Sequence, residues 1–144
     1  MNHDRYPDAY LRGILSDVRT IAVVGASPRP HRASHRVMRY LLRHGFRCIP
    51  VNPFACPGTI LDESCAAALA DITEPVDMVD VFRRSDAAGG VVDQAIAIGA
   101  KVVWMQLGVR DDAAAERAER HGIRVVMNRC PAIEMPRLGL GGPE

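Results

Sequence analysis

A chain of 144 residues is the length of one domain, so we expect a single folded unit over residues 1–144. Eighteen Lys and Arg residues against seventeen Asp and Glu residues leave a formal net charge of +1, which argues against a general attraction to nucleic acid. The sequence has no uninterrupted run of about 18 apolar residues and no apolar signal segment at its N-terminus, so it predicts a cytoplasmic protein without a membrane span.

Helical and strand patterns alternate along the chain. Apolar residues recur at helical spacing in some segments, while short continuous apolar runs are typical of strands buried on both faces of a parallel sheet. In chain order the predicted elements are a helix at 6–18 within an N-terminal segment 1–19, a strand at 20–24, a helix at 34–44, a strand at 46–51, a candidate short strand at 59–61, a helix at 63–70, a strand at 76–82, a helix at 86–98, a strand at 101–106, a helix at 111–121, a strand at 123–127 and a helix at 131–138.

This alternation predicts an α/β fold, a three-layer doubly wound (Rossmann-like) parallel β-sheet with helices on both faces. Gly45, Gly99 and Gly122 each stand at the end of a predicted helix and before the next strand, which supports this order of elements. The Gly- and Pro-rich tail at 139–144 is expected to be loose.

The loop after the first strand predicts a site for an anion. Ligands of open parallel sheets bind outside the carboxyl ends of the strands. Gly25 permits a tight turn there, and residues 29–36 contain three arginines, two histidines and no acid beside a helix N-terminus, which itself favours anions. The alternative is a solvated basic loop whose helix is capped by Ser34.

The chain lacks the glycines and the acid that typical NAD and ATP sites contain, which makes these two anions less favoured as ligands. The fingerprint GxGxxG is absent because Gly25 is the only glycine in the segment 20–44, and residues 50–53 offer no carboxylate for the ribose of NAD. The GxxxxGK[ST] phosphate loop of ATPases is also missing. A site for NAD(P), with a 2′-phosphate near the arginines of the first loop, stays open as an alternative.

Five motifs, taken in their order, resemble those of a known family. They lie at 21–27 (IAVVGAS), 50–53 (PVNP), 79–83 (VDVFR), 103–108 (VWMQLG) and 127–130 (MNRC). Over most of its length the chain is similar to the small stand-alone coenzyme A-binding proteins, which are related to the cofactor-binding domain of the succinyl-CoA synthetase α subunit.

The resemblance implies that coenzyme A lies across the strand ends. Residues of the first loop would face its phosphates, the segment 51–53 would border its adenosine, and Phe82 and Arg83 would lie on the neighbouring strand end. With the residues that follow the later strands, the predicted cofactor-binding residues are Gly25, Ala26, Ser27, Pro28, Arg32, Ser34, Val51, Asn52, Pro53, Phe82, Arg83, Gln106 and Cys130.

Cys130 follows the last predicted strand at this edge of the sheet. We expect Arg129 and the helix that begins after Cys130 to lower the pKa of its thiol, which would then be able to form a mixed disulfide with the cofactor thiol. The plainer alternative is a structural cysteine. No arrangement of Ser, His, Asp or Cys predicts a catalytic or metal site, and Trp104 is expected in the core.

The favoured interpretation is a protein that binds coenzyme A or acyl-CoA, is non-catalytic by itself and serves as a carrier, a sensor or an accessory subunit. The alternatives are an enzyme that acts on acyl-CoA with Cys130 as nucleophile, and an NAD(P)-binding domain. A protein partner or a homo-oligomer is compatible with the sequence, whereas nucleic-acid and membrane partners are not predicted.

Overall fold

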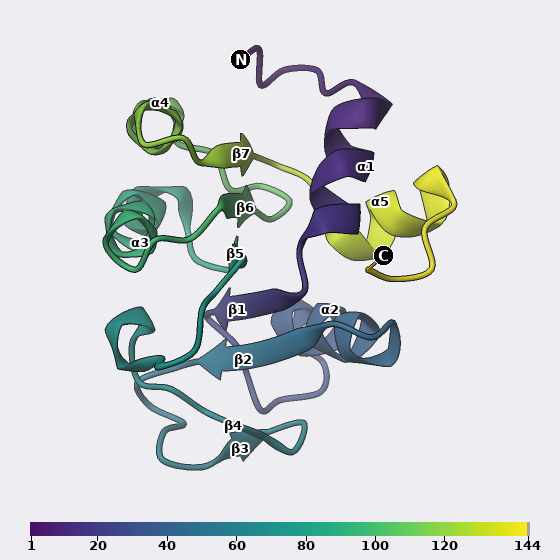
Figure 1. The fold of residues 1–144 in the computed structure, drawn as a ribbon. Coiled ribbons are helices and arrows are strands. Elements are labelled where there is room, and N and C mark those ends of the chain that lie inside the picture. Colours follow the sequence, from purple (N-terminus) through teal and green to yellow (C-terminus); the bar gives the residue numbers. More distant parts are fainter. Residues whose placement is uncertain (144) are drawn as a thin grey trace.

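Five parallel strands form the central sheet of the computed structural model, which describes residues 1–143 (Figure 1). All residues of the central strand at Met78–Val81 and of its neighbour at Val102–Met105 are buried, as expected for strands covered on both faces. The strands lie in the order β2-β1-β5-β6-β7 and comprise β1 (Thr20–Val24), β2 (Arg47–Val51), β5 (Met78–Val81), β6 (Val102–Met105) and β7 (Arg124–Val126).

Helices cover both faces of this sheet, which confirms the predicted three-layer α/β fold. They are α1 (Asp8–Asp17), α2 (Ala33–Arg43), α3 (Ser85–Ala97), α4 (Asp112–Arg120) and α5 (Pro131–Leu138). Helices α3 and α4 pack on one face, while α1, α2 and α5 pack on the other (Figure 1). The predicted stops at Gly45, Gly99 and Gly122 are confirmed, since each follows its helix with a positive φ.

The predicted helix at 63–70 is wrong. The chain instead forms a short antiparallel hairpin of β3 (Thr59–Ile60) and β4 (Glu63–Ser64), followed by one turn of 3₁₀-helix, η1 (Leu69–Asp71). The short strand expected at 59–61 is therefore confirmed, and it belongs to a separate two-stranded sheet that lies beside β2 (Figure 1).

Backbone pairing with β2 explains why this alanine-rich segment is not helical. The N–H of Ala66 donates to the Pro50 carbonyl at 2.9 Å, and the N–H of Asn52 donates to the Ala66 carbonyl at 2.9 Å. The segment therefore runs alongside the end of β2 as a parallel bridge. Helix propensity is a weak preference, and tertiary hydrogen bonds of this kind override it.

Both ends of the described chain make polar contacts with the folded body. Near the N-terminus, the backbone N–H of Met127 donates to the Tyr6 hydroxyl at 2.8 Å. Near the C-terminus, the ring Nδ1–H of His44 donates to the Gly141 carbonyl at 2.9 Å. Residue 144, the last of the tail that we expect to be loose, lies outside the described residues.

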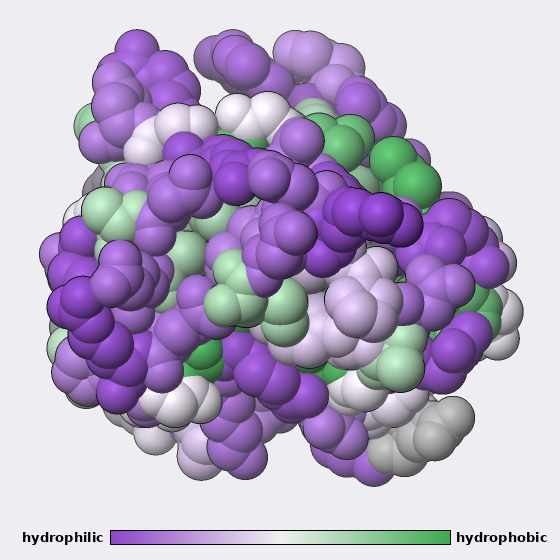
Figure 2. Space-filling model, turned by 90° about the horizontal axis from the view of Figure 1, so that it is seen from above, coloured by the Kyte–Doolittle hydropathy of each residue, from purple (hydrophilic) through white to green (hydrophobic). Residues whose placement is uncertain are grey.

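The face seen in Figure 2 is mostly hydrophilic, and its hydrophobic residues form small separate spots. No helix within residues 1–143 is both long enough and apolar enough to cross a membrane. Of the four exposed large hydrophobic residues in residues 1–143, Phe54 is 96% exposed and Leu107 57%. These two lie at the carboxyl edge of the sheet, where two cavities open.

Asp80 is a fully buried acid within β5. Neither of its carboxyl oxygens has a hydrogen-bond partner in residues 1–143, and the thiols of Cys48 and Cys130 are near enough to interact with it electrostatically. Burial raises the pKa of Asp80 well above its ordinary value, so the folded protein favours the neutral acid.

Replacing Asp80 by Asn should therefore change how stability depends on pH. The unfolded chain loses this proton from about pH 4 upward, whereas the folded chain keeps it until the pH passes the raised pKa. Over that interval the free energy of unfolding of the parent protein should fall relative to Asp80→Asn, by up to about 1.4 kcal/mol per pH unit. Urea unfolding at several pH values, with the exposed-site control Asp86→Asn, measures the difference. Parallel curves for Asp80→Asn and its parent would contradict the assignment.

Candidate functional site

The strand order creates a crevice between β1 and β5. The chain leaves β1 through α2 toward β2 at one side, and it leaves β5 through α3 toward β6 at the other. The two connections therefore cover opposite faces of the sheet and diverge at the carboxyl ends of these adjacent strands. Such a reversal of strand order is where open parallel sheets bind their ligands.

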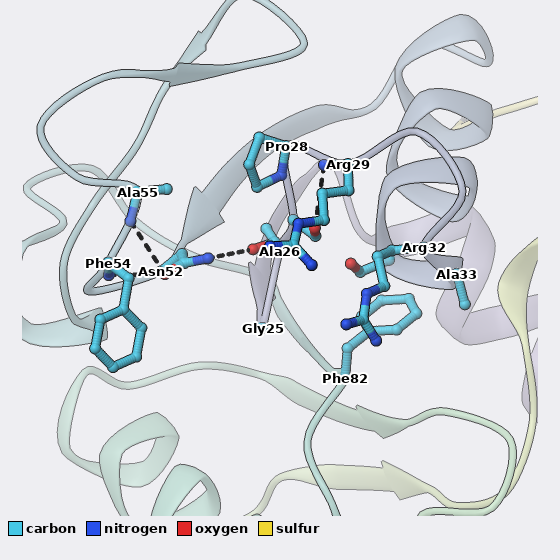
Figure 3. Close-up of a pocket in the computed structure, with 12 residues that line it drawn as sticks. Gly25, Ala26, Pro28, Arg29, Arg32, Ala33, Asn52, Phe54, Ala55 and Phe82 are labelled. Atoms are coloured by element: carbon cyan, nitrogen blue, oxygen red, sulfur yellow. Dashed lines mark hydrogen bonds between the residues drawn. The ribbon is translucent and has the colours of Figure 1, made fainter.

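A cavity of about 490 Å³ opens at this crevice (Figure 3). The loop after β1 and the first residues of α2 form much of its wall, and the loop after β2 forms the opposite side. Its lining residues are Gly25, Ala26, Ser27, Pro28, Arg29, Arg32, Ala33, Ser34, Asn52, Phe54, Ala55 and Phe82. We call this space the first cavity, and its volume lies in the range of ordinary small-molecule sites.

Gly25 lets the backbones of β1 and β5 meet at the floor of the first cavity. Its φ is +87°, and a Cβ placed on it would lie 2.5 Å from the carbonyl oxygen of Phe82. Its N–H donates to the Val51 carbonyl at 3.1 Å, so the residue also joins the ends of β1 and β2. Any side chain here would both strain the turn and collide with backbone.

The basic loop after β1 is held by its own hydrogen bonds. The N–H of Arg29 donates to the Ser27 hydroxyl at 3.1 Å, and the Nδ1–H of His35 donates to the Ser27 carbonyl at 2.9 Å. The guanidinium groups of Arg29 and Arg32 form no ion pair with any acid in residues 1–143. These two guanidinium groups are therefore available to bind an anion.

The alternative of a serine cap at Ser34 is wrong. Helix α2 begins at Ala33 with Arg32 as its N-cap, and no side chain caps it. Ser34 is instead only 5% exposed inside the first turn, where it lines the first cavity. The N–H groups of an uncapped first turn are free to bind an anion, and the helix dipole favours one there.

Asn52 joins the two sides of the first cavity. Its Nδ2 donates to the Ala26 carbonyl at 2.8 Å, and its Oδ1 accepts from the N–H groups of Phe54 at 2.8 Å and Ala55 at 3.2 Å (Figure 3). The side-chain amide is therefore occupied on both atoms. Asn52 lines the cavity and positions Phe54 on its rim.

A second cavity, of about 330 Å³, continues the crevice toward β6 and α5. It shares Ala33 and Phe82 with the first cavity, so the two are adjacent. Its walls are mostly apolar, with arginines on one side and a thiol on another. The lining residues are Ala33, Val37, Phe82, Arg83, Arg84, Gln106, Leu107, Gly108, Val109 and Cys130.

The expectation that the pKa of Cys130 is lowered is wrong. Burial raises it, and the electrostatic effect of Asp80 acts in the same direction. Hydrogen bonds from the backbone N–H groups of Ala132 and Ile133 at the start of α5 lower it, but they are outweighed. The thiol is therefore protonated near neutral pH, and its reactivity depends on what is brought beside it.

The structure brings most of the predicted cofactor-binding residues to the two cavities. Gly25, Ala26, Ser27, Pro28, Arg32, Ser34, Asn52 and Phe82 line the first cavity, and Phe82, Arg83, Gln106 and Cys130 line the second. Val51 and Pro53 line neither. Val51 is a buried strand residue that accepts the Gly25 hydrogen bond, whereas Pro53 is exposed beside the cavity.

The sequence prediction omitted Phe54, which is the most exposed large hydrophobic residue of the chain. The signal available for it was a single aromatic residue directly after the Asn52-Pro53 turn. The prediction also omitted Val37, Leu107 and Val109 of the second cavity, because apolar residues carry no signal that separates a cavity wall from the core. Trp104 lies in the core, as expected, with no exposed surface.

The family model of the CoA binding domain matches residues 19–136. The chain belongs to this CoA-binding family. The matched residues include the turn at Gly25 and the basic loop, so the crevice between β1 and β5 lies within the region that the family model covers. Membership supports a role in coenzyme A binding.

Individual relatives and solved structures are similar to this chain over much of its length. The protein YneT of Bacillus subtilis (strain 168) is 36% identical over 122 residues, which cover 85% of this chain and 89% of that protein. A hypothetical protein from Pyrococcus horikoshii OT3 has a similar structure, with a TM-score of 0.88, 39% identity and 94% of both chains covered. The chain also resembles part of a dinucleotide forming acetyl-coenzyme A synthetase 1 of Ca. Korarchaeum cryptofilum, with a TM-score of 0.68, 26% identity, and coverage of 77% of this chain and 26% of that one.

Substituting Gly25 by Ala should destabilise the protein by at least about 2 kcal/mol, because both the positive φ and the Phe82 carbonyl oppose a Cβ. The matched control is Gly90→Ala in α3, where a Cβ meets nothing within 4 Å. An alanine in that exposed helix position should stabilise by about 0.5–1 kcal/mol. Urea denaturation of the three proteins gives both values, and equal stability of Gly25→Ala and its parent would refute the close approach.

Proposed function

We propose that the protein binds coenzyme A or its acyl derivatives reversibly in the crevice between β1 and β5, and that it carries out no chemistry on them alone. The observation that carries this proposal is the uncapped, acid-free N-terminus of α2, which faces the first cavity together with Arg29 and Arg32. Coenzyme A has phosphates at one end of an adenosine and a long pantetheine arm that ends in a thiol, so it needs a basic site continued by an apolar one.

The charge distribution supports a phosphate site at this loop. No Asp or Glu occurs between Asp17 and Asp62, although this segment contains seven arginines. Near the end of this segment Arg47 pairs with Glu63 at 2.8 Å and Glu74 at 3.1 Å, whereas Arg29 and Arg32 form no ion pair with an acid of residues 1–143. Guanidinium groups bind phosphate oxygens in a fork geometry, and the unneutralised arginines of the first cavity have no other anion in reach.

Phe54 supports an adenosine site on the opposite side of the first cavity. Its ring is 96% exposed, and hydrogen bonds from the N–H groups of Phe54 and Ala55 to Asn52 hold the backbone beneath it. An exposed aromatic ring costs free energy in water unless it is covered. A purine base stacked on the ring would cover it, and such stacking is worth about 1–3 kcal/mol.

The lining of the two cavities favours binding over catalysis. Neither cavity is lined by an Asp, Glu or His side chain, so the lining residues include no group that commonly acts as a general base at neutral pH. The similarity to part of an acetyl-coenzyme A synthetase fits a cofactor-binding module that larger proteins combine with other domains. The proposed role is therefore that of a carrier, a sensor or an accessory subunit.

Calorimetric titration with coenzyme A, acetyl-CoA, NAD and NADP tests the proposal. We expect binding of coenzyme A, and Arg32→Ala should weaken it about tenfold or more because a charge-assisted hydrogen bond to phosphate is lost. The matched control is Arg43→Ala, which removes an exposed arginine from the last turn of the same helix, away from both cavities. Equal weakening by both substitutions would show only a general charge effect. Tighter binding of NAD or NADP than of coenzyme A would overturn the cofactor assignment.

Incubation of acetyl-CoA with an equal amount of protein tests the absence of catalysis. The thioester should be recovered intact, at the rate of loss seen with Gly25→Ala or with buffer alone, because neither cavity presents a base that could activate water. Chromatography of the nucleotide gives the remaining fraction. Hydrolysis that disappears in Cys130→Ala would instead indicate an enzyme with this thiol as nucleophile.

A further inference from the structure

The second cavity is placed to receive the thiol end of a ligand whose phosphates occupy the first cavity. The two spaces meet at Ala33 and Phe82, with the basic loop on one side of this boundary and Cys130 on the other. Val37, Val109 and the exposed Leu107 give the second cavity apolar walls. A flexible arm with few polar groups fits such walls better than a second phosphate does.

Gln106 provides an independent sign that this cavity is completed by a ligand. The residue lines the cavity and is only 5% exposed, yet its Oε1 has no hydrogen-bond partner in the described part of the chain. The other end of the amide is bonded, because Nε2 lies 3.5 Å from the Arg129 carbonyl and the side chain also hydrogen-bonds the Cys130 thiol. A buried acceptor left without a donor destabilises the folded protein. This oxygen has almost no accessible surface, so a turn of the side chain toward the cavity is what would let it accept from an amide N–H of the kind that the pantetheine arm carries.

Cys130 lines the same cavity with a free thiol. It stands at the N-terminus of α5, where burial raises the pKa of the thiol and hydrogen bonds from the N–H groups of Ala132 and Ile133 offset only part of that rise. Cys56 and Cys65 are more exposed than Cys130 but line neither of the two cavities. Simple accessibility would therefore direct a small disulfide reagent to Cys56 or Cys65, whereas a ligand bound in the crevice would be directed to Cys130.

We propose that Cys130 forms a mixed disulfide with coenzyme A by exchange with the disulfide form of the cofactor bound in the crevice, an inference that rests on the proposed function. The Cys130 thiol loses its proton to solvent, and its Sγ attacks one sulfur of the cofactor disulfide. The bond between the two cofactor sulfurs breaks as the new bond to Sγ forms, and the departing coenzyme A thiolate takes up a proton. The cofactor disulfide is the oxidant, so no further reactant is needed. The site thereby distinguishes the oxidised from the reduced cofactor.

The experiment compares two disulfides on one protein. Reduced protein is first titrated with coenzyme A in the presence of a reductant, which tests the proposed function by itself. The reductant is then removed, and coenzyme A disulfide or glutathione disulfide is added at mildly alkaline pH, where more thiol is ionised. Intact mass and peptide mapping after an acid quench locate the modified cysteine. We expect one coenzyme A per chain on Cys130, released by dithiothreitol.

The kinetics should show that the crevice directs the reaction. Modification of Cys130 by coenzyme A disulfide should be about tenfold or more faster than by glutathione disulfide, because binding holds the reacting sulfur in place. Arg32→Ala should slow the first reaction and leave the second unchanged. Cys130→Ser should lose the rapid adduct, while Cys56→Ser should retain it. Mapping on the unaltered protein decides the site even if Cys130→Ser does not fold.

The outcomes separate this inference from the proposed function. If reduced coenzyme A is bound but Cys130 stays unmodified, or if both disulfides react with it equally fast, the inference is overturned and the binding function stands. An adduct confined to Cys56 or Cys65 overturns it in the same way. If coenzyme A is not bound at all in the first titration, the proposed function fails and the inference fails with it.

Discussion

Gly25 brings the end of β1 so close to β5 that a methyl group at this position would lie 2.5 Å from the Phe82 carbonyl oxygen. The rest of the site depends on this approach. Gly25 turns the chain toward α2 at the point where the connections from β1 and β5 diverge. Because Gly25 has no side chain, the floor of the first cavity stays open. It also places Phe82 at the boundary between the two cavities, so the crevice continues from the basic loop toward α5.

Unbalanced charge distinguishes this crevice from the remaining surface. Many arginines of the chain meet a carboxylate, as Arg110 does with Asp4 at 2.7 Å and Asp112 at 3.0 Å. Exposed pairs of this kind contribute little stability, but they do neutralise the surface locally. Arg29 and Arg32 lack such partners and stand beside an uncapped helix N-terminus. The repulsion between these two cations and the positive end of the helix dipole is small in water. When a phosphate is present, the cations and the helix end all attract it.

Polar groups without partners gather at the other end of the crevice. Asp80 lies within β5 and Gln106 directly follows the adjacent strand β6, and both have buried oxygen atoms that accept no hydrogen bond from residues 1–143. Buried polar atoms without hydrogen-bond partners are rare in folded proteins, because burying each one costs free energy that burying an apolar side chain does not. Their position next to Cys130 favours a functional reason over a structural one, since a purely structural core would be cheaper with leucine or methionine at these positions.

The sequence by itself determined the order of the elements and the place of the basic loop. Hydrophobic spacing and helix-ending glycines depend on residues that are neighbours in the chain, so the five strands of the central sheet, the five α-helices and the turn at Gly25 could be predicted from local pattern alone. Only the tertiary structure decided that the alanine-rich segment 63–70 pairs with β2 and that Phe54 stands on a cavity rim. It also decided that burial raises the pKa of Cys130. These properties depend on desolvation and on contacts between segments that are far apart in the chain. Around the second cavity, for example, α2 meets the segments that follow β5, β6 and β7. No pattern of neighbouring residues predicts such contacts.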